Sequence, residues 1–563
     1  MLWGIPPGLL LIAGALLVPL LAGPWRKAYM TILPIAGLWA LAGADHGSFY
    51  TFSLFAYEIE PVRIDALSLI FGYIFHIAAL LSVVYAWHND DTIEQMAGLA
   101  YAGSGIGALF AGDLITLFVY WEAMAVTSVF LIWARRTDAA YRAGMRYLII
   151  QVGSGVLLLS GAILLAHETG SIAFVKMSLG SLATWLILIA FGIKCAFPFM
   201  HNWLQDAYPE ATITGTVFLS AFTTKCAVYA LARGFPGTEL LIYVGAAMTA
   251  FPIFYAVIEN DLRRVLAYSL NNQLGFMVVG VGIGSALAIN GAAAHAFAHI
   301  LYKALLFMSM GAVLYRVGTI KGSELGGLYK SMPLTTIFCI VGAASISAFP
   351  LFSGFIAKSL TLSAVAHDGY LVVWLILLFA SAGVFHHSGI KIPYFAFFAH
   401  DSGKRCKEAP LNMLIAMGIT AFLCIAIGVY SPWLYSLLPY AVDYKPYTVS
   451  HVINQTQLLM FSALAFAVLM RYKIYPPELK SVNLDFDITY RKWLPATYHW
   501  LITVTRDGWH SILEDLKNAV TGVIRQMFRH HGPEGILART WPTGSMALWV
   551  AVLLGGFLLL YYL

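Results

Sequence analysis

Long apolar segments separated by short polar loops dominate the hydropathy pattern of the chain. Roughly 20 consecutive apolar residues span a bilayer as a helix, and segments of that kind recur along the whole sequence. The pattern predicts an all-α polytopic membrane protein with about sixteen transmembrane helices. The segments are 2–22, 28–43, 66–87, 93–111, 113–134, 145–166, 181–201, 211–233, 238–257, 264–286, 289–316, 333–362, 370–397, 411–431, 456–472 and 544–563.

Three short loops are basic and predict the orientation of the chain. They are 135–142, 321–330 and 400–409, and each follows an odd-numbered apolar segment. Basic loops stay on the cytoplasmic side of a membrane. We therefore expect a multi-pass protein of the bacterial inner membrane with both termini in the periplasm. The N-terminal stretch lacks a basic region before its apolar core, and it is predicted to be a membrane helix, not a cleaved signal.

The stretch 473–543 interrupts the apolar pattern. Within it, residues 498–528 place apolar side chains at helical spacing with charges between them. This pattern predicts one amphipathic helix that lies along the cytoplasmic membrane surface or along the flank of the protein. A soluble linker helix is the alternative.

Two apolar segments contain interruptions. Pro198 lies inside FGIKCAFPFMHNWLQDAYPEA (191–211), and Pro350 lies inside ASISAFPLFSGFIAKSL (344–360). Proline removes a backbone donor and clashes with the preceding helical turn. Paired interruptions in two halves of a membrane protein indicate inverted repeats and an ion site. A lysine accompanies each interruption, four residues before the first proline and eight after the second, and this opposite order fits an inverted repeat.

Ionisable side chains recur inside the apolar segments. A charge at the bilayer centre costs roughly 2.5–3.5 kcal/mol on insertion scales, so we expect these groups to face one another or water. Three of them are spaced four residues apart and would line one face of a helix. The candidates are Glu122, Lys194, Lys225, His295, His299, Lys303 and Lys358, with His386, His387 and Lys391 as possible additions.

These residue types suit proton transfer. A buried lysine near a carboxylate can gain and lose its proton, and histidine can pass a proton between its two nitrogens. The column of His295, His299 and Lys303 is therefore predicted to be one part of a proton wire. For either histidine alone, packing is the alternative role. Lys391 is expected to extend to the membrane interface.

Composition excludes several other classes of function. Charged residues make up 11% of the chain, against about 25% in soluble domains, and the net charge of +5 gives no indication of nucleic acid. The five cysteines form no CxxC pair, which argues against disulfide, zinc and iron–sulfur frameworks. No glycine-rich nucleotide loop is present. A metal at the two central histidines is disfavoured, because Lys303 would repel a cation. We expect no cofactor, no metal and no nucleic-acid partner.

Five motifs together carry a family resemblance. They are WE at 121–122, GIKCAFPFMHNWLQDAYPEA at 192–211, ENDLRRVLAYSLNNQLGFM at 259–277, HAFAHILYKALLF at 295–307 and FPLFSGFIAKSL at 349–360. With these motifs, residues 65–400 resemble the antiporter-like subunits shared by Mrp-type multisubunit cation/proton antiporters and the proton-translocating membrane arm of respiratory complex I.

The resemblance implies two inverted five-helix repeats within a core of fourteen helices, followed by a lateral helix and an anchor. It implies an ion pair of Glu122 and Lys194 in one half-channel, with Lys225 linking it toward the centre. His295, His299 and Lys303 match the central residues, and Lys358 matches the lysine of the second broken helix. The expected division is 1–92 for N-terminal helices, 93–235 and 236–400 for the repeats, 401–472 for C-terminal core helices, 473–543 for the linker with its lateral helix, and 544–563 for the anchor.

The stretch GIKIPYFAFFAHDSG (389–403) is most similar to the D-type component of Mrp-type sodium/proton antiporters. We therefore expect a proton-translocating subunit of a sodium- or potassium-coupled antiporter, embedded in lipid with other membrane subunits and without a redox centre. Two alternatives stay open. One is a proton-pumping subunit of a complex I-like NADH:quinone oxidoreductase or a membrane-bound hydrogenase, and the other is an energy-coupling subunit of an inorganic-carbon uptake complex.

Overall fold

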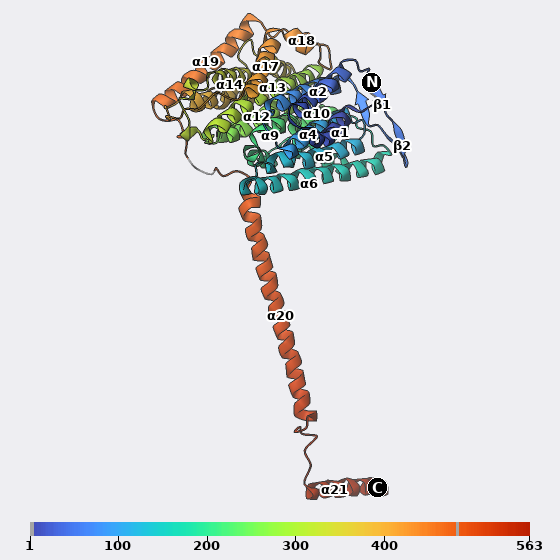
Figure 1. The fold of residues 1–563 in the computed structure, drawn as a ribbon. Coiled ribbons are helices and arrows are strands. Elements are labelled where there is room, and N and C mark those ends of the chain that lie inside the picture. The colour runs from blue at the N-terminus through green and yellow to red at the C-terminus, as the bar shows by residue number, and fades with distance from the viewer. Residues whose placement is uncertain (1–4, 480–482) are drawn as a thin grey trace. The chain divides into compact units, whose positions relative to one another are not determined.

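The computed structural model describes residues 5–479 and 483–563, and most of them are helical (Figure 1). Its internal contacts divide the chain into two units, Met1–Asn483 and Leu484–Leu563, which are described separately. The predicted all-α membrane architecture is confirmed. The beginning of the first predicted segment (2–4) and part of the predicted linker (480–482) lie outside the described residues.

In the first half of the larger unit, most of the helices coincide with the predicted apolar segments. They carry many of the buried apolar side chains of the core. Many of these helices begin at a capping Asp, Ser or Thr, whose side chain accepts from the first free backbone N–H groups. They are α1 (Pro7–Leu17), η1 (Val18–Leu20), α2 (Gly23–Ala42), α3 (Ala66–Tyr85), α4 (Thr92–Phe110), α5 (Leu114–Trp133), α6 (Asp138–Thr169), α7 (Leu182–Lys194), α8 (Asn202–Ala207), η2 (Tyr208–Glu210), α9 (Ile213–Ala221), α10 (Thr223–Gly234) and α11 (Leu240–Ile258).

The second half contains two long helices, the second broken segment and several π-helical turns. The elements are α12 (Leu262–Ile283), α13 (Ala286–Val317), η3 (Gly322–Glu324), η4 (Leu328–Lys330), α14 (Pro333–Ile346), α15 (Ser353–His367), α16 (Leu371–Val384), the π-helical η5 (Phe385–Lys391) and η6 (Tyr394–Phe398), α17 (Leu411–Val429), α18 (Ser431–Tyr435) and α19 (Val449–Arg471).

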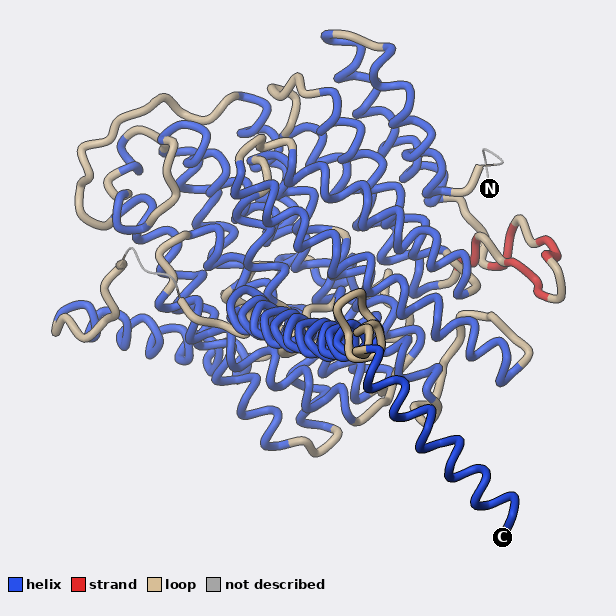
Figure 2. The backbone as a smooth tube through the Cα atoms, turned by 90° about the horizontal axis from the view of Figure 1, so that it is seen from below, coloured by secondary structure: helices blue, strands red, loops and turns tan. Residues whose placement is uncertain are grey.

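Four short strands lie in the loop before α3, and the hydropathy pattern did not predict them. β1 (Gly47–Phe49) pairs antiparallel with β4 (Val62–Ile64), and β2 (Phe52–Leu54) pairs antiparallel with β3 (Tyr57–Ile59). Figure 2 shows them at one edge of the larger unit, near the N-terminus. Strands of three residues are too short to leave a clear alternating pattern in the sequence.

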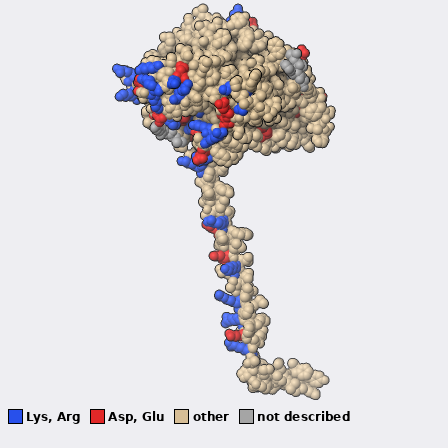
Figure 3. All heavy atoms as spheres, viewed as in Figure 1, with Lys and Arg blue, Asp and Glu red and all other residues tan. Residues whose placement is uncertain are grey.

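Ten helices in the described residues are long and apolar enough to cross a membrane, and three shorter apolar helices accompany them. The count of about sixteen stays a prediction. Figure 3 shows the charged side chains of the larger unit gathered mainly at the end opposite β1 and β2 in that view, whereas much of the surface between is uncharged. An uncharged surface of this kind suits contact with lipid.

Two halves of the larger unit share local features at a constant separation. Asp113 begins α5 and bridges to Ala173, and Asp261 begins α12 and bridges to Lys321. α6 and α13 both have 32 residues and both end at a glycine with positive φ. The second set lies 148 positions after the first (261 against 113, 286 against 138, 318 against 170). These matches support two structural repeats, and the repeat boundaries given above stay a proposal.

The two breaks have the same backbone geometry. Ala196 and Phe199 flank Pro198 with φ of +61° and +70°, and Ala348 and Leu351 flank Pro350 with φ of +59° and +75°. The left-handed conformation costs a residue with a Cβ roughly 1–2 kcal/mol, and such strain is concentrated at functional sites. A repeated strained turn therefore makes the two breaks candidates for function.

The smaller unit consists of η7 (Thr489–Trp493), the long helix α20 (Leu494–His531) and the apolar helix α21 (Thr543–Tyr562). α20 confirms that 498–528 is one helix. Its apolar side chains, among them Trp509 and Leu516, are exposed within this unit. The lateral position of α20 on the cytoplasmic surface stays a prediction.

Candidate proton-transfer path

Glu122 and Lys194 lie at the first break but do not form the expected direct ion pair. Lys194 is the last residue of α7, is fully buried, and donates from Nζ to the carbonyl oxygen of Trp121 at 2.5 Å. Glu122 follows Trp121 on α5, and its Oε1 is buried without a hydrogen-bonding protein atom. The lysine therefore binds the backbone next to the carboxylate.

Lys225 and Lys358 also bind carbonyl oxygens beside helix breaks. Lys225, in α10, donates to Ser220 O at 2.6 Å across the kink between α9 and α10. Lys358, in α15, donates to Ile346 O at 2.7 Å, and Ile346 is the last residue of α14. A break in a helix leaves carbonyls without an intrahelical donor, and each lysine satisfies one of them.

The central column lies on α13, which packs against α9, α10, α12 and α15. His295, His299 and Lys303 are all fully buried. His295 Nε2 lies 3.2 Å from Gln273 Oε1 and 3.0 Å from Tyr302 Oη. Among the described residues, neither ring nitrogen of His299 nor Nζ of Lys303 has a hydrogen-bonding partner. Buried polar groups of this kind normally form hydrogen bonds with protein or with water. The nitrogen atoms of His299 and Lys303 are therefore available to bind bridging water.

The additional candidates lie in the π-helical turn η5. His387 Nδ1 lies 2.9 Å from Ser388 Oγ, and Ser388 donates to Ser269 of α12 at 2.7 Å. His386 stacks on Tyr475 with ring centroids 5.4 Å apart. π-helical turns are frequent at functional sites, and here the turn brings His387 toward α12.

The expectation for Lys391 is wrong. Its side chain is fully buried, not extended to the interface. Nζ donates to Val257 O at 2.6 Å and to Glu259 O at 2.7 Å, and it forms an ion pair with Glu478 at 2.9 Å. Backbone carbonyls at the end of α11 and a carboxylate replace the water that a snorkelling lysine would reach.

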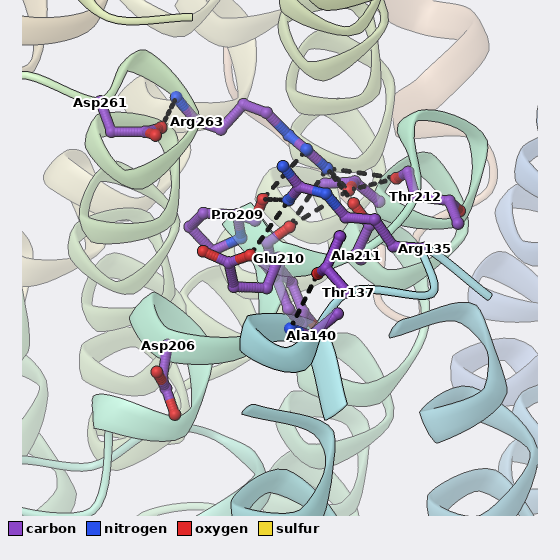
Figure 4. A network of polar contacts seen from close by, with 12 residues as sticks. Arg135, Thr137, Ala140, Asp206, Pro209, Glu210, Ala211, Thr212, Asp261 and Arg263 are labelled. Carbon is purple, nitrogen blue, oxygen red and sulfur yellow. Dashed lines mark hydrogen bonds and ion pairs between the residues drawn. The ribbon is translucent and has the colours of Figure 1, made fainter. Parts of the chain in front are cut away.

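Arg263 fixes the loop after the first break to α12 (Figure 4). Its buried guanidinium donates to the carbonyl oxygens of Tyr208, Pro209, Ala211 and Thr212 at 3.1–3.2 Å. A planar fork of five donors suits such a cluster of acceptors. The guanidinium thus joins the two predicted repeats.

Replacing Arg263 with alanine should lower the free energy of unfolding by about 2–4 kcal/mol, because several buried carbonyls would lose their donor. The neighbouring Arg264, whose side chain is about one-third exposed, is the matched control, and Arg264→Ala should cost under about 1 kcal/mol. Denaturant titration of the purified chain in detergent measures both. Equal losses for the two variants would contradict the role given to Arg263.

Sequence reasoning missed several residues that touch the candidates. Gln273 and Tyr302 bind His295 and each other, and Glu478 binds Lys391. Two of them left a signal. Gln273 ends a polar run inside an apolar helix, and Tyr302 lies two turns after His295 on one helix face. Nothing in the local sequence of Glu478 indicates a buried partner.

Fold and site together define a polytopic helical membrane protein with a series of buried lysines and histidines and one half-buried glutamate in its core. Residues 111–383 match the family described as NADH:quinone oxidoreductase/Mrp antiporter, transmembrane. These residues belong to that family, and they include every principal candidate from Glu122 to Lys358.

Curated relatives come from two kinds of complex. The chain is 32% identical to the D-type component of the Na(+)/H(+) antiporter of Alkalihalophilus pseudofirmus over 50% of this chain and 62% of that one. It is 26% identical to hydrogenase-4 component B of Escherichia coli over 68% of this chain and 64% of that one. The chain therefore spans less than two thirds of the length of these relatives.

Solved structures share the fold. The Mrp complex of Dietzia sp. DQ12-45-1b matches with a TM-score of 0.76 and 22% identity, over 92% of this chain and 62% of that one. A chain of the archaeal membrane-bound sulfane sulfur reductase matches with a TM-score of 0.71 and 22% identity, over 99% of both chains.

Proposed function

We propose that the chain is a proton-translocating subunit of a multisubunit sodium- or potassium-coupled proton antiporter in the bacterial inner membrane, working beside other membrane subunits. One observation carries this proposal. Buried lysines recur at both helix breaks and at the α9–α10 kink, and each binds a backbone carbonyl. Lys225 and Lys358 bind carbonyls at the kink and at the second break, whereas Lys194 binds Trp121 O of the neighbouring α5. These lysines lie on α7, α10 and α15, and Lys303 lies on α13. α7 contacts α10, α10 contacts α13 and α13 contacts α15, as a path across the protein requires.

The proposed path runs from Glu122 and Lys194 through Lys225 to the central column and on to Lys358. We extend it through His387 to Lys391 of η5. At each carbonyl-held lysine, the ammonium makes a charge-assisted hydrogen bond. Loss of the proton weakens that bond and frees the amine to accept another proton. His299 and Lys303 have no such fixed acceptor among the described residues, so bridging water is proposed to carry protons between them and their neighbours.

The alternative function is a proton-pumping subunit of a redox-driven complex. The match to hydrogenase-4 component B over 68% of this chain supports this alternative, and the higher identity to the sodium/proton antiporter component supports the first proposal. The same path of buried residues serves either function.

Ion flux in inside-out membrane vesicles that contain the native assembly separates the two functions. If the first proposal holds, adding sodium or potassium should dissipate a preformed pH gradient without an electron donor. If the alternative holds, proton movement should require oxidation of an electron donor and ignore both cations. Mass spectrometry of the purified assembly, which identifies the other subunits, is the independent check.

A further inference from the structure

The ammonium of Lys391 lies in a buried cage of four oxygen atoms. Three are the backbone carbonyls of Ala256, Val257 and Glu259 at 3.3, 2.6 and 2.7 Å. They are at or just past the C-terminal end of α11, where the helix dipole favours a cation. The fourth is a carboxylate oxygen of Glu478 at 2.9 Å.

Glu478 reaches this cage from the segment 472–479, which follows α19. Its side chain is only 6% exposed. Gly322 lies close by, since a Cβ on that glycine would sit 3.4 Å from Glu478 Oε2. The carboxylate is therefore packed between the end of α11, η5 and the turn at η3, within the larger unit.

Hydrogen-bond counting shows why Lys391 needs this carboxylate. An ammonium offers three hydrogens, and here it faces four acceptors. A neutral amine would keep two hydrogens and point a lone pair at the same oxygens, so the cage opposes loss of the proton unless one oxygen accepts it. Backbone carbonyls are too weakly basic to take a proton, whereas a carboxylate accepts one once burial has raised its pKa.

We propose that Glu478 accepts the proton of Lys391 and is a further proton-transfer residue at this end of the path. In this step an N–H bond of the ammonium breaks and an O–H bond forms on Glu478, which leaves an amine beside a carboxylic acid. The total charge of the pair is unchanged, and no other reactant is needed. The inference rests on the proposed function, because it gives the path an acid after Lys391.

The surroundings of Glu478 suit a carboxyl group that takes up a proton. Burial raises the pKa of Glu478, the charge of Lys391 lowers it, and the negative charge of Glu259 raises it again, with a net rise. Tyr475 packs against His386 in the same region, and Glu259 also lies 4.0 Å from Arg264. Glu478 is therefore protonated more readily than an exposed glutamate.

The test replaces Glu478 with glutamine in the native assembly, which preserves size and a hydrogen-bonding oxygen. Proton transport in vesicles should fall about tenfold or more, with subunit abundance unchanged by immunoblot. Asp401→Asn is the matched control, because Asp401 is a partly exposed carboxylate paired with Lys330 and Arg405, and this variant should transport like the parent. Transport by Glu478→Gln at the parent rate would overturn the inference.

A second variant and a second readout cover a failure of Glu478→Gln to assemble. Lys391→Arg keeps a cation in the cage but does not release its proton, so it should also lose transport, and parent-like transport would overturn the inference. Infrared difference spectra of the assembly after a pH jump should show a carboxylic-acid band that Glu478→Gln or Lys391→Arg removes. A band that survives both changes counts against this inference alone, whereas a parent assembly that moves no protons counts against the proposed function.

Discussion

Replacing Gly155 with alanine is expected to stop proton transport while the chain stays folded. Gly155 lies on α6, and the position of an alanine Cβ there coincides with Oε1 of Glu122 on α5. The carboxylate would have to leave its place beside Trp121 and Lys194. A displaced catalytic or transfer group can lower a rate by about a hundredfold, and this is the loss we expect.

Gly153 provides a matched control on the same helix. Apart from the backbone of its own helix and its chain neighbours, no heavy atom lies within 4 Å of the Cβ position at Gly153. Alanine stabilises a helix by about 1 kcal/mol relative to glycine at either position, so the change in helix propensity is the same in both variants. Proton flux in vesicles and immunoblot abundance should be normal for Gly153→Ala. Normal flux in both variants would show that the position of Glu122 does not matter.

The separation of 148 residues between the two repeats relates Gly155 to a position in the second repeat. In α13 the matching position is Lys303 (303 against 155), so the second repeat has a base where the first has no side chain. In the first repeat, the carboxylate of Glu122 occupies that space from the neighbouring helix. Both repeats therefore place a titratable side chain at this position. In the second repeat it comes from α13 itself, and in the first it comes from the neighbouring helix α5.

Lys303→Ala is expected to lower proton transport by about a hundredfold or more. Lys303 is fully buried at the centre of α13, and its removal leaves no lysine in the step between Lys225 and Lys358. Alanine is the best helix former, so α13 should persist and the subunit should assemble. Lys330→Ala, which removes a surface lysine paired with Asp401, is the control and should transport normally. A parent-like rate in Lys303→Ala would exclude Lys303 from the path.

Hydropathy and proline placement predicted much of the fold. The apolar segments form helices. α7 ends four residues before Pro198, and α14 ends four residues before Pro350. These features are local, because the apolar segment and the proline that interrupts it are both read directly from the sequence. A proline alone does not decide the matter, since Pro34 in α2 and Pro252 in α11 lie inside continuous helices. The strands β1 to β4 escaped prediction because three residues carry too little periodicity.

Most of the predicted site residues are buried, with Glu122 and His386 half-buried, but several of their partners could not be read from the sequence. Lys194 was expected to bind Glu122, whereas the end of α7 directs its ammonium to the carbonyl of Trp121. Backbone carbonyls occur at every residue, so no sequence pattern identifies the one that a lysine will reach. Lys391 was misjudged for a related reason, since its carboxylate partner follows it by 87 positions (478 against 391) in a polar segment.

The central claim is that Lys303 carries a proton, and Lys303→Arg tests it most directly. Arginine keeps the positive charge of the column but stays protonated at all physiological pH values. The measurement is the initial rate of proton uptake after a pH jump, in vesicles that contain the whole assembly with normal subunit abundance. We expect Lys303→Arg to be as inactive as Lys303→Ala. Uptake at the parent rate would make Lys303 a fixed charge and would contradict a proton path through α13.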